Sequence, residues 1–278
     1  MVGIAFVYAY VTVIAPDFMV KRSVTAEPIV ASEAVPSNTF VPKFRDLPNF
    51  DEIKYRKPSG KLIELLEDGI YRRSDLVAKN GEKWLVMIGK GDHSQLYVRR
   101  ANVKLLNSIS WLGDEKDAQL TFDGLWGDRI IALRSVRNVK EGPITTLFLK
   151  KLYAEDKNGL PDHEEISTDY IRDFFLSGNK YSLYTAIGST RDGTTAAVLV
   201  LETEGKQQII RQVKHVERDR DIFGSLLWVG DMDRDGKLDI YLDEFNGIGF
   251  TATELHLSSH ADPGKLVGLA ADFGMPGC

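Results

Sequence analysis

The stretch LLWVGDMDRDGKLDIYLD, residues 226–243, decides the predicted fold of the chain. Four aspartates stand at positions 1, 3, 5 and 9 of a loop that begins at residue 231, and a glycine stands at position 6. Carboxylates this close repel one another unless a cation lies between them, and glycine at position 6 permits the sharp turn that wraps a loop around calcium. Magnesium prefers fewer protein ligands and a strict octahedron, so calcium is the predicted ion. The predicted ligands are Asp231, Asp233, Asp235 and Asp239 through their side chains, Lys237 through its backbone carbonyl, and one water.

The residues that flank this loop predict strands rather than helices. Leu226 to Val229 form an apolar run, and after the loop apolar residues alternate with Asp239, Tyr241 and Asp243 at a period of two. An EF-hand loop needs a bidentate glutamate at position 12 and a helix on each side, whereas position 12 here is Leu242. The stretch is therefore predicted to be a β-hairpin around a calcium loop. A solvated acidic turn without metal is the alternative.

The segment GDMDRDGKLDIYLD resembles the calcium-loop hairpin of FG-GAP and VCBS-type repeats, which occur in integrin-like propellers and many exported bacterial proteins. Residues 225–278, which include TELHLSSHADPGKLVG, also resemble the C-terminal end of uncharacterised exported bacterial proteins with one such hairpin. The resemblance implies the same four aspartates and the same lysine carbonyl as ligands. Because a propeller needs several blades and the chain has one copy of the loop, we expect a single propeller-blade-like sheet in the C-terminal part.

Composition places the chain among globular proteins with one large or two small domains. It has 278 residues, of which 43% are hydrophobic and 10% aromatic, which is enough for a proper core. The net charge of −5 and the scattered basic residues argue against a nucleic-acid partner, because phosphate binding needs clustered lysine and arginine. Cys278 is the only cysteine, so neither an intramolecular disulfide nor a cysteine-rich metal site is expected.

The first 48 residues predict an exported protein. Residues 1–26 begin with an apolar run too short for a membrane span and end in small residues that suit signal-peptide cleavage, although a charged start is missing. A first core strand is the alternative reading of this run. Residues 27–48 contain four prolines and are predicted to be a linker. We therefore expect a mature protein without a stable membrane span, located in the periplasm or secreted.

The remainder predicts a mainly β protein of antiparallel meander sheets with few short helices. In residues 49–150, short strand-like runs recur about every ten residues between turn signals, which indicates an N-terminal β-domain built as a small barrel or sandwich. Residues 151–278 predict a C-terminal β-domain that contains the calcium hairpin. No helix long enough to cross between parallel strands is predicted, so the sheets should be antiparallel. The predicted strands are 62–66, 84–88, 96–98, 103–106, 120–122, 130–136, 181–187, 195–201, 208–213, 253–257 and 265–270.

Two segments between the halves each allow two interpretations. The loop at residues 154–165 contains several carboxylates and an Asn-Gly turn, but Ala154 occupies the first ligand position of a calcium pattern. A solvated turn is therefore favoured over a second calcium site. The residues after it either begin a short helix at Ser167, whose hydroxyl can cap, or form a strand.

Enzyme signatures are sparse. The sequence has no Gly-x-Ser-x-Gly elbow, phosphate loop, dinucleotide fingerprint or His-Glu-x-x-His motif. The residue types of a hydrolase triad are present in one short stretch, at His256, Ser258, Ser259, His260 and Asp262, but residue types do not supply its geometry. Trp84, Trp111 and Trp126 are interpreted as core residues rather than an exposed aromatic platform, and Glu64 and Glu67 as surface charge.

The favoured hypothesis is a non-catalytic, exported, calcium-binding β protein in which the ion is structural and the surface contacts an unknown protein or glycan. The alternative is a calcium-stabilised extracellular hydrolase with its active site between the two halves. A His–carboxylate pair in a deep pocket would favour the enzyme.

Overall fold

The computed structural model describes residues 63–67, 70–73, 76–89, 96–109, 116–123, 129–134, 138–149, 165–189, 195–214, 223–245 and 250–276. These residues belong to one compact unit, Phe44–Cys278, and form fifteen strands and a single 3₁₀ turn, η2 (Ser258–His260). The mainly β prediction is confirmed. The predicted leader and linker, and residues 154–164 of the second acidic loop, lie outside the described residues.

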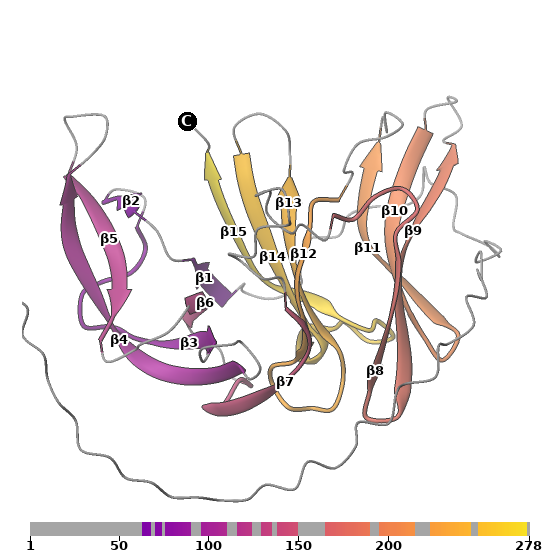
Figure 1. Cartoon of the computed structure of the whole chain (residues 1–278), viewed down its shortest axis with the longest axis horizontal. Helices are drawn as coiled ribbons and strands as arrows, with labels where there is room; N and C mark the ends of the chain where they lie inside the picture. The colour runs from indigo at the N-terminus through magenta and orange to yellow at the C-terminus, as the bar shows by residue number, and fades with distance from the viewer. Residues whose placement is uncertain are drawn as a thin grey trace, which may run out of the picture. The chain divides into compact units, whose positions relative to one another are not determined.

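Nine strands close into a barrel (Figure 1). Around the ring they follow the order β4-β3-β6-β1-β15-β14-β13-β12-β7, and pairing of β7 with β4 closes it. Two further strands, β2 (Ile70–Arg72) and β5 (Lys116–Phe122), continue the sheet beyond β4. The barrel strands are β1 (Ile63–Leu66), β3 (Lys83–Gly89), β4 (Leu96–Ile109), β6 (Arg129–Arg134), β7 (Gly142–Leu149), β12 (Leu226–Asp231), β13 (Asp239–Phe245), β14 (Phe250–Leu257) and β15 (Gly268–Pro276).

Alternation along the strands fills the barrel with apolar side chains. Every barrel strand contributes at least one side chain to a single interior core, which includes Met87, Trp228 and Leu255. Neighbouring residues point outward, because successive side chains of a strand face opposite sides. On β3 the outward side chain of Trp84 is buried under β2 and β5, and its indole N–H donates to Glu82 Oε2 at 3.1 Å. Trp84 is a core residue, as predicted, whereas Trp111 and Trp126 lie outside the described residues.

The remaining four strands form a separate antiparallel sheet in the order β11-β10-β9-β8. These strands are β8 (Ile171–Leu176), β9 (Asn179–Ser189), β10 (Thr195–Thr203) and β11 (Lys206–Lys214). One face of this sheet packs against the outer face of β12 and β13, where Leu199 and Ile240 share a core. The segment after Ser167 is thus a strand, and the predicted calcium hairpin belongs to the barrel rather than to this sheet.

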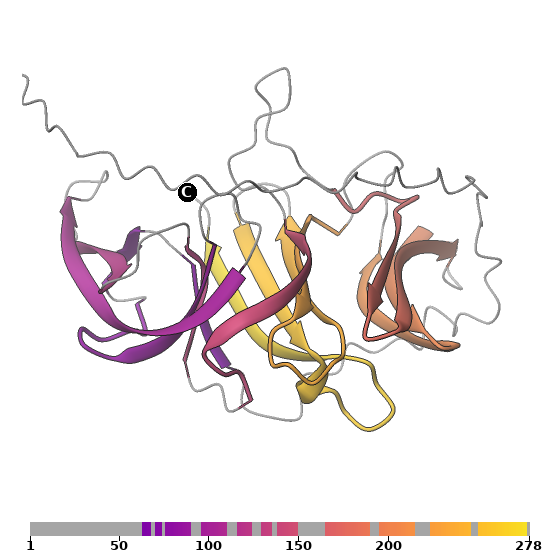
Figure 2. The ribbon, with the colours of Figure 1, turned by 60° about the horizontal axis from the view of Figure 1, so that its bottom comes forward.

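Several details depart from the sequence-based expectations. The predicted strands 96–98 and 103–106 are one strand, β4, because no glycine or proline separates them; its first half pairs with β3 and its second half with β5. Figure 2 shows β7 beside β12, with which it pairs. The barrel therefore contains strands from both sides of the predicted boundary at residue 150. β1 and β15 pair in parallel, whereas antiparallel sheets were expected. The chain between β1 and β15 contains all of the other strands, so these two strands can lie parallel without a crossover helix.

A buried charged network joins the four-stranded sheet to the barrel. Arg211 on β11 donates from Nε to Glu254 Oε2 on β14 at 2.8 Å, and from Nη1 to the carbonyls of Phe223 and Asp243. His256 Nε2 lies 3.1 Å from the same carboxylate oxygen. Burial alone would raise the pKa of Glu254, but the His256 hydrogen bond and the Arg211 charge lower it to about 2.

We predict that Glu254→Gln lowers the free energy of unfolding at pH 7 by about 3 kcal/mol, because Arg211 then loses its buried counter-ion. A depressed folded-state pKa gives stability that is present above the unfolded value of 4.5 and lost as pH falls toward 2. The difference from wild type should therefore shrink below pH 4.5. Denaturant unfolding at several pH values measures it. Glu141→Gln, which breaks the exposed pair with Arg100, is the control and should cost at most about 1 kcal/mol.

Candidate metal centre

The β12–β13 hairpin carries the predicted calcium loop, and its connection is a tight turn. Asp231 ends β12 and Asp239 begins β13. Between them Arg234 and Gly236 adopt left-handed backbone conformations, with φ of 62° and 80°. Glycine adopts this conformation without strain, and Arg234 is anchored by donating from Nη2 to the Lys140 carbonyl at 3.1 Å. The strand–loop–strand prediction for this stretch is confirmed.

Two apolar side chains fix the loop between separate cores. Met232 is fully buried in the barrel interior. Leu238 is buried on the opposite side, in the core shared with the four-stranded sheet. Because both ends of the loop are packed, the polar residues between them are held in a defined arrangement.

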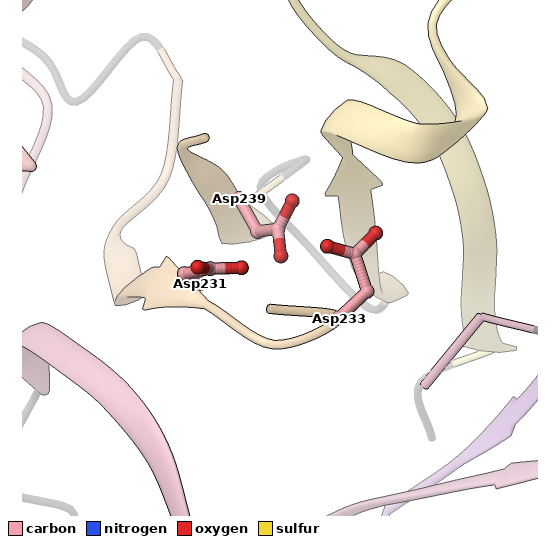
Figure 3. A group of neighbouring side chains, drawn as sticks. All are labelled: Asp231, Asp233 and Asp239. Atoms are coloured by element: carbon pink, nitrogen blue, oxygen red, sulfur yellow. The ribbon is translucent and has the colours of Figure 1, made fainter. Parts of the chain in front are cut away.

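Three carboxylates of the loop converge. Asp231, Asp233 and Asp239 each offer an oxygen that lies within 4.8 Å of the others, and Figure 3 shows the three side chains pointing toward a common space. All three are buried, with exposures of 6%, 7% and 0%. The structure thus brings together three of the four aspartates that the sequence pattern identified.

Backbone amides of the loop hold two of these carboxylates. Asp231 accepts from the N–H groups of Asp235 at 3.2 Å and Gly236 at 3.0 Å. Asp233 accepts through Oδ1 from the Asp235 N–H at 3.3 Å. These amides orient the carboxylates but carry no net charge, so they do not neutralise them.

Asp239 connects the hairpin to a distant turn. Its Oδ2 accepts from the Met232 N–H at 2.7 Å, and its Oδ1 accepts from the Ser258 N–H of η2 at 2.8 Å. Each carboxylate oxygen has two lone pairs, so both oxygens retain one for a further partner. The contact to Ser258 has no local signal in the sequence, because it joins residues from two different connections.

The electrostatics of this cluster are those of uncompensated negative charge. Burial raises the pKa of Asp239 well above its ordinary value, and the charge of Asp233 raises it further. Burial also raises the pKa of Asp231, against the opposing hydrogen bonds from the loop amides. Among the described residues, no lysine or arginine forms an ion pair with any of the three. On η2, burial lowers the pKa of His260, and the charge of Asp233 opposes this.

One oxygen of the cluster has the surroundings expected of a metal ligand. Asp233 Oδ2 is buried and has no hydrogen-bond partner among the residues that the structure describes. A buried carboxylate oxygen without a partner is costly, because it has lost its water without gaining a replacement. A cation among the three carboxylates would satisfy this oxygen and neutralise the repulsion. The donor set is all oxygen, so the residues present fit a hard cation such as calcium.

The other two predicted ligands lie differently. Asp235 is not part of the group of three; its carboxylate accepts from the Lys237 N–H at 2.9 Å and lies 3.7 Å from Lys237 Nζ. Its charge nevertheless raises the pKa of Asp231, so it remains close to the cluster. Ligation by Asp235 and by the Lys237 carbonyl stays a prediction.

The residue types of a hydrolase triad do not form one in the described structure. His256 has the carboxylate partner that the sequence did not reveal, Glu254, but the same carboxylate oxygen also pairs with the buried Arg211. Ser258 Oγ has no hydrogen-bond partner, so it is not linked to a histidine base.

The interpretation of Glu67 as surface charge is wrong. Its carboxylate accepts from the hydroxyl of Tyr241, a residue of the barrel interior whose hydroxyl oxygen also lies 3.0 Å from Thr253 Oγ1. Burial raises the pKa of Glu67, and the Tyr241 hydrogen bond opposes the shift. Glu64 instead pairs with Arg134 on the neighbouring strand.

Comparison with protein-family models, curated proteins and solved structures found no match for this chain. In the part of the chain that the structure describes, no helix has the length and apolar character needed to cross a membrane.

We predict that the calcium-free protein becomes more stable as pH falls from 7 toward the ordinary pKa of an aspartate. The folded-state pKa values of Asp231 and Asp239 are raised, so the folded state binds protons before the unfolded state does. Stability then increases as pH falls through the raised values. Melting temperatures in chelator measure this trend. In saturating calcium the trend should vanish or reverse, since protons then compete with the ion; parallel trends in both conditions would contradict the assignment.

Proposed function

We propose that this protein is a calcium-binding β-barrel protein in which the ion is structural. The observation that carries the proposal is the buried, unpartnered Oδ2 of Asp233 among three converging carboxylates. The loop places these groups with its own amides and with two packed side chains, and leaves their charge unbalanced. A bound cation supplies the missing charge.

The ligand chemistry favours calcium over other ions. The three side chains offer hard oxygen donors, and neither cysteine nor histidine belongs to the group. The loop spacing, with Gly236 at position 6 in a left-handed conformation, agrees with the FG-GAP-like pattern on which the expectation was based. Asp235 and the Lys237 carbonyl would add further oxygens, in keeping with the six to eight that calcium takes.

A structural role follows from where the ion would lie. Asp231 and Asp239 stand at the two facing ends of neighbouring barrel strands, and Asp239 also holds η2. An ion there joins the two strands of the hairpin to each other, and through Asp239 it also stabilises the connection between β14 and β15. The described residues around it form no arrangement of nucleophile and base, so nothing in the site favours catalysis.

We predict that Asp233→Asn uncouples stability from calcium. Removing one of three repelling charges should raise the melting temperature in chelator, while the increase on adding calcium should be largely lost. For the wild type, calcium at a hundredfold excess over Kd should add about 2.7 kcal/mol. Scanning fluorimetry with and without chelator measures both effects.

The matched control is Asp123→Asn, an exposed aspartate beside Lys104, which should respond to calcium as the wild type does. A wild-type melting temperature that is indifferent to calcium and chelator would contradict the proposal.

We further propose that the protein works outside the cytoplasm. The apolar run in residues 1–20 supports export, and a loop without the bidentate glutamate of an EF-hand suits the weak affinities of extracellular calcium modules. Calorimetry should give a Kd of about 10⁻⁴ to 10⁻³ M, and cell fractionation should recover the protein in the periplasm or medium. A submicromolar Kd removes the affinity argument, and recovery of uncut protein from the cytosol contradicts export.

A further inference from the structure

A second buried oxygen near the cluster lacks a partner. Ser258 is 6% exposed, and its Oγ, like Asp233 Oδ2, is buried without a hydrogen bond. A serine hydroxyl can donate one hydrogen bond and accept two, and it rotates freely to find partners. Among the described residues none takes this role, which leaves the lone pairs of Oγ free for a bound group.

The backbone of Ser258 keeps this hydroxyl near the cluster. The Ser258 N–H donates to Asp239 Oδ1 at 2.8 Å, and Oγ is joined to that nitrogen only through Cα and Cβ. The hydroxyl therefore lies beside the Asp239 carboxylate. The charge of Asp233 acts on His260, the last residue of the same turn, so η2 also lies near Asp233.

The turn that carries Ser258 is held against β15. The Ala261 N–H donates to the Ser258 carbonyl at 3.1 Å and closes the turn. At Gly268, the first residue of β15, an added Cβ would lie 1.9 Å from the His260 carbonyl oxygen, so only glycine permits this close approach. Further along the same connection, Gln208 of β11 accepts from the N–H groups of Leu266 and Val267. The hydroxyl is thus presented from a rigid segment outside the loop.

We propose that Ser258 Oγ is a ligand of the same ion, contributed from outside the calcium loop. The proposal rests on the proposed function, since it requires an ion among Asp231, Asp233 and Asp239. A hydroxyl is a neutral, hard oxygen donor, which calcium accepts alongside carboxylates and carbonyls. One ion then satisfies both unpartnered oxygens and joins the hairpin to the β14–β15 connection.

Ser258→Ala tests this by separating affinity from stability. The substitution keeps the N–H that Asp239 accepts, so the melting temperature in chelator should stay unchanged or rise, because a buried hydroxyl without a partner is removed. Calorimetric titration should show a calcium Kd raised about tenfold, the lower end of what altered groups around metal sites cost. Ser259→Ala, at the exposed neighbouring position, is the control and should leave both values unchanged.

Ser258→Cys provides a direct signature of contact with the ion. A thiol is a poor calcium ligand but binds soft cadmium, and a cadmium–thiolate bond gives an ultraviolet charge-transfer band. We expect that band in the variant and not in Ser259→Cys, with Cys278 replaced by serine in both proteins. Unchanged calcium affinity in Ser258→Ala together with no band in Ser258→Cys would overturn the proposal while leaving the calcium site standing. A wild type that binds no calcium in calorimetry would overturn both.

Discussion

Mutual repulsion among three buried carboxylates is the constraint on which the rest of this structure depends. Asp231, Asp233 and Asp239 are brought together because β12 and β13 must pair, and because Met232 and Leu238 fill two different cores. The apolar packing that stabilises the barrel therefore also forces like charges into one place. The loop amides orient these charges without neutralising them, and no lysine or arginine among the described residues pairs with any of the three carboxylates.

The network at Glu254 also contains a buried carboxylate, but there its negative charge has a positively charged side chain beside it. There a buried carboxylate has Arg211 and His256 beside it, and the lowered pKa of Glu254 records that its charge is compensated. At Asp239 the carboxylate has only amide donors, and its pKa is raised. The two sites lie on neighbouring barrel strands, β13 and β14. The described residues thus supply a cationic partner to Glu254 and none to Asp239, a difference that agrees with the proposed cation at the loop.

Local patterns explain which features were predictable from the sequence. The hairpin around residues 231–239 was predictable because its ligand spacing, its glycine and the alternation of its flanks all lie within one short stretch. The meander of β9, β10 and β11 was predictable for the same reason. Barrel closure by β7 and β4 was not, because period-two alternation shows that a strand exists but not which strand it pairs with.

The unpredicted parts of the candidate site are likewise long-range. The contact between Ser258 and Asp239, and the buried position of Glu67 beside Tyr241, depend on which connections the barrel brings together. The spacing rule treated Asp235 as equivalent to its neighbours, although packing leaves its carboxylate beside Lys237. Residue types and spacing thus identify the chemistry of the loop, whereas the fold decides which members of the pattern converge.

The parallel pairing of β1 with β15 has a consequence for how the chain folds. Ile63 lies opposite Ala271, so the ring joins segments from nearly opposite ends of the described sequence. During synthesis on the ribosome, β1 emerges long before β15, and until then one edge of β1 has no partner. Contacts of such large sequence separation slow folding, and open strand edges invite aggregation. The barrel therefore closes only after translation of β15, and until then the edge of β1 is open to pairing with other chains.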